Sequence, residues 1–243
     1  MMYYINRTKI VLLLGALILV SCHGLEELNE NPDQIGSENV DPNLLLPTVI
    51  NGAGKSVVNL GFGDLAGVMQ HTQKDGWSSG HNAYDWSNDS HSWNGYYSLL
   101  TNNKTLIEKA EEDNLDFHRG VGLVMKSFLF GLITDLWGDA PYSQALRGDE
   151  GPEFFDAAFD DQKLIYEGIL TDLGIANNLL SRGQGTYFSI ETDQDILYGG
   201  DVSKWRKFAN SLALRYYMRL SAKEPSWAEQ GIKTIVANRQ QYP

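Results

Sequence analysis

The stretch TDLWGDAPYSQAL, residues 134–146, follows a long apolar segment and marks the point at which that segment ends. Upstream of it, apolar side chains recur at helical steps of three and one between Val121 and Leu136. Gly138 suits the conformation with positive φ that closes a helix, and Pro141 prevents the helix from resuming. We therefore expect a central helix over 116–137, packed by neighbours along its length, that ends in a rigid corner.

The corner itself has two interpretations. In the structural one, Trp137 packs the turn onto the core, Asp139 accepts hydrogen bonds from backbone N–H groups, and Tyr142 is buried with its hydroxyl satisfied. In the functional one, the same three side chains line a ligand site. The residues by themselves favour the structural interpretation.

Helical periodicity continues on both sides of this corner. A first helix starts near Asp41 and is weakened by Gly52 and Gly54. Spaced apolar faces predict further helices, at residues 93–112, 116–137, 161–180, 203–222 and 227–238. Trp205 and Phe208 lie on the apolar face of the fourth of these helices and are assigned to the core. Antiparallel helix pairs with short turns predict a stacked helical-repeat fold.

The same stretches also resemble a known family. TDLWGDAPYSQAL is similar to the D-x-W-G-D-x-P-Y-S-x-A-L signature of SusD/RagB-type nutrient-binding lipoproteins of the outer membrane. Two more blocks are similar to segments of that family, QKLIYEGILTDLGIANNLL at 162–180 and GGDVSKWRKFANSLALRYYMRLS at 199–221. The resemblance implies an all-α fold of tetratricopeptide-like stacked helical hairpins with long irregular loops. Because family members are much longer, it also implies that this chain is their N-terminal part.

The resemblance carries expectations about function as well. It implies a lipid-anchored protein of the cell outer membrane, facing the exterior, that binds glycans and delivers them to a SusC-like TonB-dependent transporter. An alternative interpretation is a helical-repeat lipoprotein that binds peptides or serves as a structural subunit of an envelope complex. A surface glycosidase is a third, because paired carboxylates are available among the 31 acidic residues.

The segment 76–93 has the most unusual composition in the chain. It contains Trp77, Tyr84 and Trp86 among Ser, Asn, Asp and His residues and lacks helical periodicity. Flat rings flanked by amide and carboxylate groups suit a sugar, whose C–H faces stack on the rings while its hydroxyls are hydrogen-bonded. We therefore name Trp77, Tyr84 and Trp86 as candidate ligand-binding residues. The alternative is that the three rings anchor a long loop on the helices.

Other residues of this segment receive structural roles. Trp93 begins the apolar stripe of the following helix and is expected in the core. His81 and His91 could bind a metal together with Asp85 or Asp89, but no tight ligand pair supports such a site. We expect solvated histidines and no metal.

The first residues have the pattern of a lipoprotein signal peptide. Residues 1–21 join a basic region with Arg7 and Lys9 to an apolar run too short to span a bilayer. Cys22 follows Leu-Val-Ser and is the expected lipidation site; the alternative is an ordinary signal peptide with a chance cysteine. Multiple acyl chains would hold the protein on a membrane. Residues 22–40 are expected to form a flexible tether and residues 41–243 the helical domain.

Composition excludes several classes of function. A formal net charge of −12 and a pI near 4.8 disfavour nucleic acid and anionic membrane surfaces as partners. Two glycine-rich stretches, 54–56 and 61–66, resemble nucleotide-binding turns but lack their remaining residues. No nucleophile elbow or H-E-x-x-H motif is present. We expect a protein that is not an enzyme and needs no cofactor.

Charged residues near the C-terminal end complete the expectations. Arg206, Arg215 and Arg219 are expected to pair with carboxylates between helices. The acidic segment 191–201 is expected to be a solvated loop, with an ion site or a partner contact as the alternative.

Overall fold

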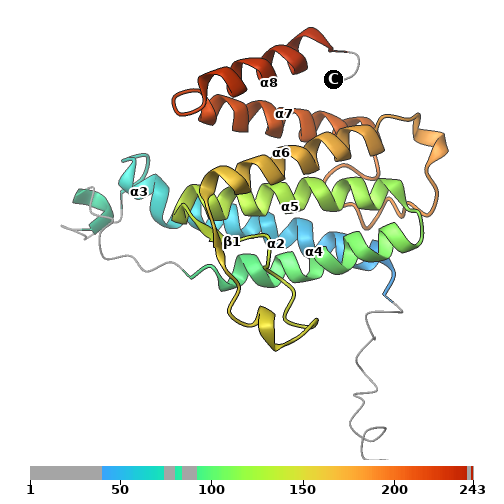
Figure 1. The fold of residues 1–243 in the computed structure, drawn as a ribbon, viewed down its shortest axis with the longest axis horizontal. Helices are drawn as coiled ribbons and strands as arrows, with labels where there is room; N and C mark the ends of the chain where they lie inside the picture. Colours follow the sequence, from blue (N-terminus) through green and yellow to red (C-terminus); the bar gives the residue numbers. More distant parts are fainter. Residues whose placement is uncertain (1–39, 74–79, 84–91, 240–241, 243) are drawn as a thin grey trace, which may run out of the picture. The chain divides into compact units, whose positions relative to one another are not determined.

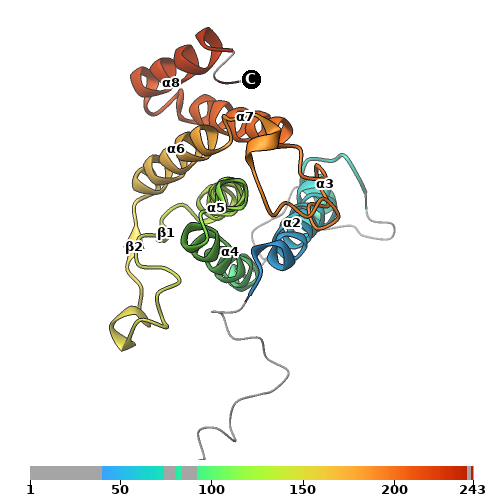
Figure 2. The same cartoon turned by 90° about the vertical axis from the view of Figure 1, so that its right-hand side faces the viewer.

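The computed structural model describes residues 40–73, 80–83, 92–239 and 242. Residues 41–243 form one compact unit that is built mainly of α-helices. The helices pack in the order α2, α4, α5, α6, α7 and α8, so each lies mainly against its neighbours in sequence (Figures 1 and 2). This arrangement confirms the predicted all-α architecture of stacked helical hairpins.

The bounds of the elements lie close to those that periodicity predicts. The main helices are α2 (Pro42–Val58), α4 (Asn94–Glu112), α5 (Asp116–Trp137), α6 (Gln162–Leu179), α7 (Val202–Leu220) and α8 (Pro225–Ala237). Shorter elements are the π-helix η3 (Asn59–Leu65), α3 (Ala66–Val68), and the 3-10 helices η4 (Gly80–Ala83), η5 (Pro152–Phe154) and η6 (Gln184–Thr186). Two residues each form β1 (Ala140–Pro141) and β2 (Phe159–Asp160), which pair antiparallel.

Helix α2 begins at a well-formed N-cap. The Asp41 side chain accepts a hydrogen bond from the backbone N–H of Asn43 at 2.8 Å, and Pro42 occupies the first helical turn. Gly52, which was expected only to weaken this helix, also has a packing role. A Cβ there would overlap the Leu99 side chain, so glycine at this position allows α2 and α4 to approach closely.

Helix α5 is the central helix of the unit, and it contacts α2, α4, α6 and α7. Its burial is broader than the single stripe predicted from periodicity, because Leu123, Ser127 and Phe130 are buried on the opposite side of the helix. Among the described residues, α5 alone is long and apolar enough to cross a membrane, but its burial identifies it as the core helix. The largest fully buried side chains around it include Trp205, Tyr216, Phe117 and Phe130.

The two predicted core residues of α7, Trp205 and Phe208, differ in burial. Trp205 is fully buried, as expected, and its indole ring packs against Tyr198 and Phe208 with ring centroids 5.2 and 5.9 Å apart. Phe208 is only half-buried, and its ring packs against the half-buried ring of Phe128 on α5, with centroids 6.1 Å apart. Truncating Trp205 would therefore leave the larger cavity of the two.

Candidate functional site

The corner after α5 closes in the way its glycine predicts. Gly138 adopts φ 76° and ψ −118°, a backbone conformation that side chains with a Cβ rarely adopt. Its N–H donates to the Thr134 carbonyl at 2.9 Å, and the Thr134 hydroxyl donates to the Gly138 carbonyl at 2.8 Å. A backbone hydrogen bond and a side-chain hydrogen bond thus both connect Thr134, in the last turn of the helix, to Gly138.

Carboxylates then fix the direction of the chain leaving the corner. Asp139 Oδ1 accepts the N–H of Gln162 at 2.9 Å and so links the corner to the start of α6. Asp160 Oδ2 accepts the N–H groups of Tyr142 and Ser143 at 3.0 and 2.7 Å, and its Oδ1 accepts the Ser143 hydroxyl at 2.9 Å. The structural interpretation of the corner therefore holds for Asp139.

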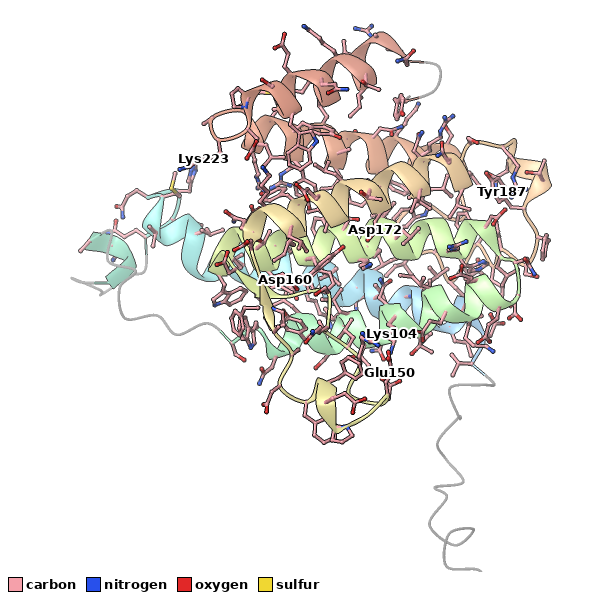
Figure 3. The ribbon with its side chains drawn as sticks, in the orientation of Figure 1. Lys104, Glu150, Asp160, Asp172, Tyr187 and Lys223 are labelled. Carbon is pink, nitrogen blue, oxygen red and sulfur yellow. The ribbon has the colours of Figure 1, made fainter. Side chains whose placement is uncertain are left out.

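Tyr142 is half-buried, and it lies near Asp172 of α6, which Figure 3 labels. Its ring packs edge-on against Phe130 with centroids 4.7 Å apart, and its hydroxyl faces Asp172 Oδ2 at 3.5 Å. Lys126 Nζ lies 2.9 Å from the same carboxylate oxygen. Burial, followed by the Asp172 charge, raises the pKa of Tyr142, so the hydroxyl remains protonated at neutral pH.

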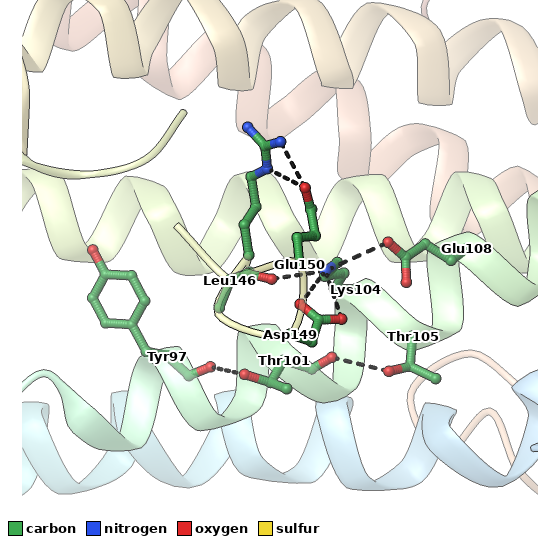
Figure 4. Close-up of polar contacts among 9 residues, drawn as sticks. Tyr97, Thr101, Lys104, Thr105, Glu108, Leu146, Asp149 and Glu150 are labelled. Atoms are coloured by element: carbon green, nitrogen blue, oxygen red, sulfur yellow. Dashed lines mark hydrogen bonds and ion pairs between the residues drawn. The ribbon is translucent and has the colours of Figure 1, made fainter. Parts of the chain in front are cut away.

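Between β1 and β2 the chain makes an excursion, residues 146–158, that we call the flap. Lys104 of α4 lies at its base, and its ammonium donates to the Leu146 carbonyl at 2.7 Å (Figure 4). The same nitrogen lies 3.2 Å from Asp149 and 3.8 Å from Glu108. Because these carboxylates are largely exposed, the bond to the buried side of the flap contributes more than the ion pairs.

Four aromatic rings meet where α4 begins, α5 ends and β2 passes. We call Trp93, Tyr96, Trp137 and Phe159 the aromatic cluster. The centroid of Trp93 lies 5.9 Å from that of Trp137 and 5.7 Å from that of Phe159, and Tyr96 lies 5.8 Å from Trp137. Phe159 is 62% exposed, and the other three rings are half-buried. The cluster therefore presents ring surface to solvent.

The position of the cluster relates it to the aromatic-rich segment. Trp93 ends the aromatic-rich segment 76–93, and Tyr96 comes about one helical turn after it. Trp93 was expected in the core, and it instead packs on the core with part of its ring exposed, because it lies at the very start of α4. No hydrogen bond within the described part of the chain engages the Tyr96 hydroxyl. Partly exposed rings with an available hydroxyl suit the C–H faces and hydroxyls of a sugar.

Sequence reasoning missed the composition of this cluster. Trp77, Tyr84 and Trp86, the candidate ligand-binding residues, lie outside the described residues, as do Cys22 and the His91 side chain. Phe159 carried no signal in the sequence, since only the pairing of β1 with β2 brings it beside Trp93. Trp137 belonged to the corner signature, where packing was the favoured interpretation and a ligand site the alternative.

The acidic segment 191–201 departs from the expectation of a solvated loop. Asp195 is buried, at 2% exposure, and its carboxylate accepts four N–H donors. Oδ2 accepts the Trp205 indole N–H at 2.7 Å and the Gly200 N–H at 2.8 Å, while Oδ1 accepts the N–H groups of Leu197 and Tyr198. The expectation was wrong for Asp195, which organises the loop from inside, whereas Glu191 and Asp193 are exposed as expected.

A second buried polar group connects this loop to α2. Asn43 Nδ2 donates to the Ser189 carbonyl at 2.8 Å, and its Oδ1 accepts the Glu191 N–H at 3.1 Å. The His118 ring lies fully buried on α5 with Nε2 2.8 Å from the same Oδ1, so Nε2 carries the proton in this arrangement. His118 Nδ1 has no partner within the described structure, and burial lowers the pKa of His118 to about 4.

The arginines of α7 follow the expectation only in part. Arg219 pairs with Asp135 of α5, whose other oxygen accepts the Tyr166 hydroxyl at 2.6 Å. Arg206 Nε instead donates to the Asn177 side chain at 2.9 Å, and Arg215 is exposed. Among the described residues, no group of three His, Cys, Asp or Glu side chains is arranged to hold a metal ion.

Helices α6, α7 and α8 also line a groove with two adjoining open pockets, of about 530 and 280 Å³. Both are lined by Leu170, Tyr217 and Trp227, and the rings of Tyr217 and Trp227 meet edge-on at 6.1 Å. Uncharged polar groups, including Asn210 and Gln230, line the smaller one. This groove is a second concave surface of the described chain.

Comparison with known proteins identifies the family. Residues 38–243 match the model of the SusD-like family, which is described as starch-binding and associating with the outer membrane. The chain belongs to the SusD-like family. None of the curated proteins with which it was compared matches this SusD-like chain.

Solved structures with the same fold include three relatives of the SusD-like chain. A SusD homologue from Bacteroides fragilis is 28% identical, with a TM-score of 0.60, over 75% of this chain and 36% of its own length. A SusD/RagB family protein from Bacteroides thetaiotaomicron is 27% identical, with a TM-score of 0.57, over 83% and 43%. A chitin-binding SusD homologue from Flavobacterium johnsoniae is 25% identical, with a TM-score of 0.54, over 61% and 30%. The chain thus spans less than half the length of these relatives.

Proposed function

We propose that this SusD-like chain is part of a non-enzymatic lipoprotein of the outer membrane that binds oligosaccharides. In this proposal, Cys22 carries the lipid anchor, the protein faces the exterior, and bound glycan passes to a SusC-type TonB-dependent transporter. Family membership over residues 38–243 supports a binding role at the outer membrane. The description of one relative as chitin-binding supports a glycan ligand.

The observation that carries the proposal is the partly exposed aromatic cluster. Rings that remain exposed at a surface have a hydration cost, which a stacked ligand offsets. The segment with Trp77, Tyr84 and Trp86 precedes the cluster in the sequence, and we propose that its three rings contact the same glycan. We call the rings that contact the glycan the aromatic platform. Such a platform binds the apolar faces of sugar rings with little dependence on charge. That independence suits a strongly acidic protein whose ligand is a neutral glycan.

The proposal is tested by calorimetric titration with chito-oligosaccharides and malto-oligosaccharides. Variants Trp77→Ala, Trp86→Ala and Phe159→Ala should each lose stacking worth ~1 kcal/mol, about a fivefold loss of affinity, with little change in melting temperature. Phe155→Ala is the matched control, because Phe155 is 71% exposed on the flap and belongs to no aromatic pair in the described structure. Unchanged affinity in all three variants would contradict the aromatic platform.

A peptide ligand is the second candidate, and the groove between α6 and α8 is the observation that favours it. The groove combines apolar side chains with amides and with the Lys163–Glu224 ion pair, a mixture that suits an extended peptide. Titration with a random-sequence peptide mixture separates the two candidates. The peptide is favoured if the peptide mixture gives a saturable heat of binding that Trp227→Ala abolishes, and if neither glycan gives any heat of binding.

A further inference from the structure

Another pocket, of about 350 Å³, lies at the end of the helical unit where α5 ends, α6 begins and α7 turns into α8 (Figure 1). Its charged lining consists of three cationic side chains, those of Lys163, Arg219 and Lys223, and two carboxylates, those of Asp135 and Glu224. We call it the cationic pocket, because it has one positive charge in excess. This sign is opposite to that of the whole chain, whose formal net charge is −12.

Both carboxylates of the cationic pocket are already paired. Asp135 Oδ1 accepts the Tyr166 hydroxyl at 2.6 Å, and its Oδ2 forms an ion pair with Arg219. Glu224 Oε1 accepts a hydrogen bond from the Lys163 ammonium at 2.7 Å. A metal cation would have to displace these partners and would be repelled by the three cationic side chains. The lining therefore disfavours a cation as the ligand.

Two of the cationic side chains have donors that a ligand can use. Within the described part of the chain, the Lys223 ammonium forms no hydrogen bond or ion pair. Arg219 uses one terminal nitrogen for Asp135, and the remaining N–H groups of its guanidinium meet no acceptor among the described residues. The Arg219 side chain is 36% exposed, so these donors are accessible from the pocket.

The turn between α7 and α8 fixes the backbone from which Lys223 extends. The Leu220 carbonyl accepts the N–H of Lys223 at 3.0 Å and that of Glu224 at 2.8 Å. The Glu224 side chain is in turn bonded to Lys163 of α6. A ligand would therefore have to order the Lys223 side chain but not the turn that carries it, which lowers the entropic cost of binding.

Unused N–H donors of a guanidinium and an ammonium suit an anionic group with two or more oxygen atoms. A guanidinium donates through two parallel N–H groups to such an anion, and an ammonium adds a compact positive charge. The volume of about 350 Å³ accommodates the anionic group together with the residue that carries it. The negative charge of the whole chain disfavours a polyanion as the ligand.

We propose that the cationic pocket binds a single carboxylate or sulfate group, held by Arg219 and Lys223. A small ligand carries this group, either an acidic sugar or an acidic amino acid. The inference goes beyond the proposed function, because the aromatic platform contacts uncharged ring faces and shares no residue with the cationic pocket.

The test is calorimetric titration of the full-length protein with three singly charged compounds: glucuronate, glucose 6-sulfate and the α-amide of N-acetylglutamate. Glucose and the α-amide of N-acetylglutamine are the uncharged references, and inorganic sulfate is titrated separately. At least one of the three charged compounds should bind saturably, whereas its uncharged reference should not. Added salt should weaken the binding, because it screens the charges of the exposed lysine.

Variants locate the binding in the cationic pocket. Lys223→Glu should lower the affinity by ~10-fold or more, the effect of losing a hydrogen bond between charged groups. Lys207→Glu is the matched control, because Lys207 is exposed on α7, does not line the pocket and changes the net charge equally. Arg219→Lys keeps a cation beside Asp135 but loses the planar fork, so it should also lower the affinity.

The outcomes divide as follows between support and refutation. Binding of glucuronate or glucose 6-sulfate that Lys223→Glu weakens supports the proposal and assigns an acidic sugar, and such binding of the glutamate derivative alone assigns an acidic amino acid. Saturation by inorganic sulfate but by none of the three organic compounds indicates an adventitious ion only and overturns the proposal. No binding at all, or an equal loss in Lys223→Glu and Lys207→Glu, also overturns it.

The same variants keep this inference separate from the proposed function. Lys223→Glu should bind chito-oligosaccharides and malto-oligosaccharides as wild type does, since Lys223 is not part of the aromatic platform. Absence of glycan binding in wild type would overturn the proposed function and leave the result for the anionic compounds unaffected.

Discussion

At the scale of single residues, buried polar side chains fix the parts of the chain that have no regular structure. Asp195, Asn43 and Asp160 each hold two or more backbone groups of a loop. Each replaces the hydrogen bonds that a helix would supply to its own backbone. The irregular loops of this protein therefore depend on a few carboxylates and amides, and changing any one of them should have a large effect.

Asp195→Asn should destabilise the protein by ~2–3 kcal/mol, measured by chemical denaturation. Each of the two carboxylate oxygens accepts two N–H groups. An amide nitrogen in place of either oxygen would therefore face two donors and could accept a hydrogen bond from neither. Asp193→Asn is the matched control; because Asp193 is exposed, the change should stay within ~0.5 kcal/mol. Equal stability of the two variants would show that Asp195 does not organise the loop.

The buried His118 makes stability depend on pH in a definite direction. Burial lowers its pKa to about 4 in the folded protein, whereas an unfolded chain binds the proton at about 6.5. The contribution is therefore complete above pH 6.5 and is lost as the pH falls toward 4. The free energy of unfolding should decrease by ~2 kcal/mol between pH 7 and pH 5 from this group.

The variant His118→Gln isolates that contribution. A glutamine amide can still donate to Asn43 Oδ1, but it does not titrate, so the variant should show a shallower decline in stability below pH 6.5 than wild type. Denaturant midpoints measured at half-unit pH intervals provide the comparison. Parallel pH profiles for the two proteins would mean that His118 is not the titrating group.

At the scale of elements, glycines decide how closely the helices approach. Gly131 of α5 lies against the ring of Tyr216 on α7, and a methyl group there would overlap the ring. The Tyr216 hydroxyl donates to the Ser127 carbonyl of α5 at 2.9 Å, so the ring cannot move without losing this bond. The packing of α7 on the central helix thus depends on the absence of one Cβ.

Gly131→Ala should destabilise the protein by ~1–3 kcal/mol, because it forces extra volume into a packed interface. Gly174→Ala makes the same substitution in the exposed part of α6, where a Cβ meets no atom within 4 Å. There the gain in helix propensity should stabilise the protein by ~0.5–1 kcal/mol. Thermal unfolding of the two variants should therefore shift in opposite directions, and shifts of the same sign would contradict this account.

At the scale of the whole molecule, the helical unit is one part of a longer architecture in its relatives. The solved relatives are about twice as long, and the chain matches them over 61–83% of its own length. The proposed platform and the proposed lipid anchor occupy different places on the chain. Separate variants should therefore remove ligand binding and membrane attachment one at a time.

Cys22→Ala should release the protein from the membrane. Multiple acyl chains hold a protein far more strongly than one, and Cys22 is the single cysteine that can accept them. After washing with salt and carbonate, wild type should remain with the outer membrane and the variant should be soluble or retained in unprocessed form. Glycan affinity of the variant should equal that of wild type, and its retention in the outer membrane would exclude Cys22 as the anchor.

The sequence by itself determined the helical architecture. Periodic apolar side chains placed α5 at residues 116–137 and located α4, α6, α7 and α8 to within about two residues at each end. Gly138 and Pro141 predicted the corner, and the signature around them indicated the family. Helix positions can be predicted from sequence because a helix forms its backbone hydrogen bonds within itself, and its buried side chains recur with the helical period.

The tertiary structure alone decided how distant residues meet. Phe159 joins Trp93 through a two-residue β ladder, and Asn43 reaches a loop 146 residues away at Ser189. Asp195 gave no sign of burial in an acidic segment, because its partners lie on backbone groups and on Trp205. Such contacts depend on how the helices pack and on which helix ends therefore lie close together. This packing depends on the combined volumes of many side chains, and no local pattern in the sequence reports it.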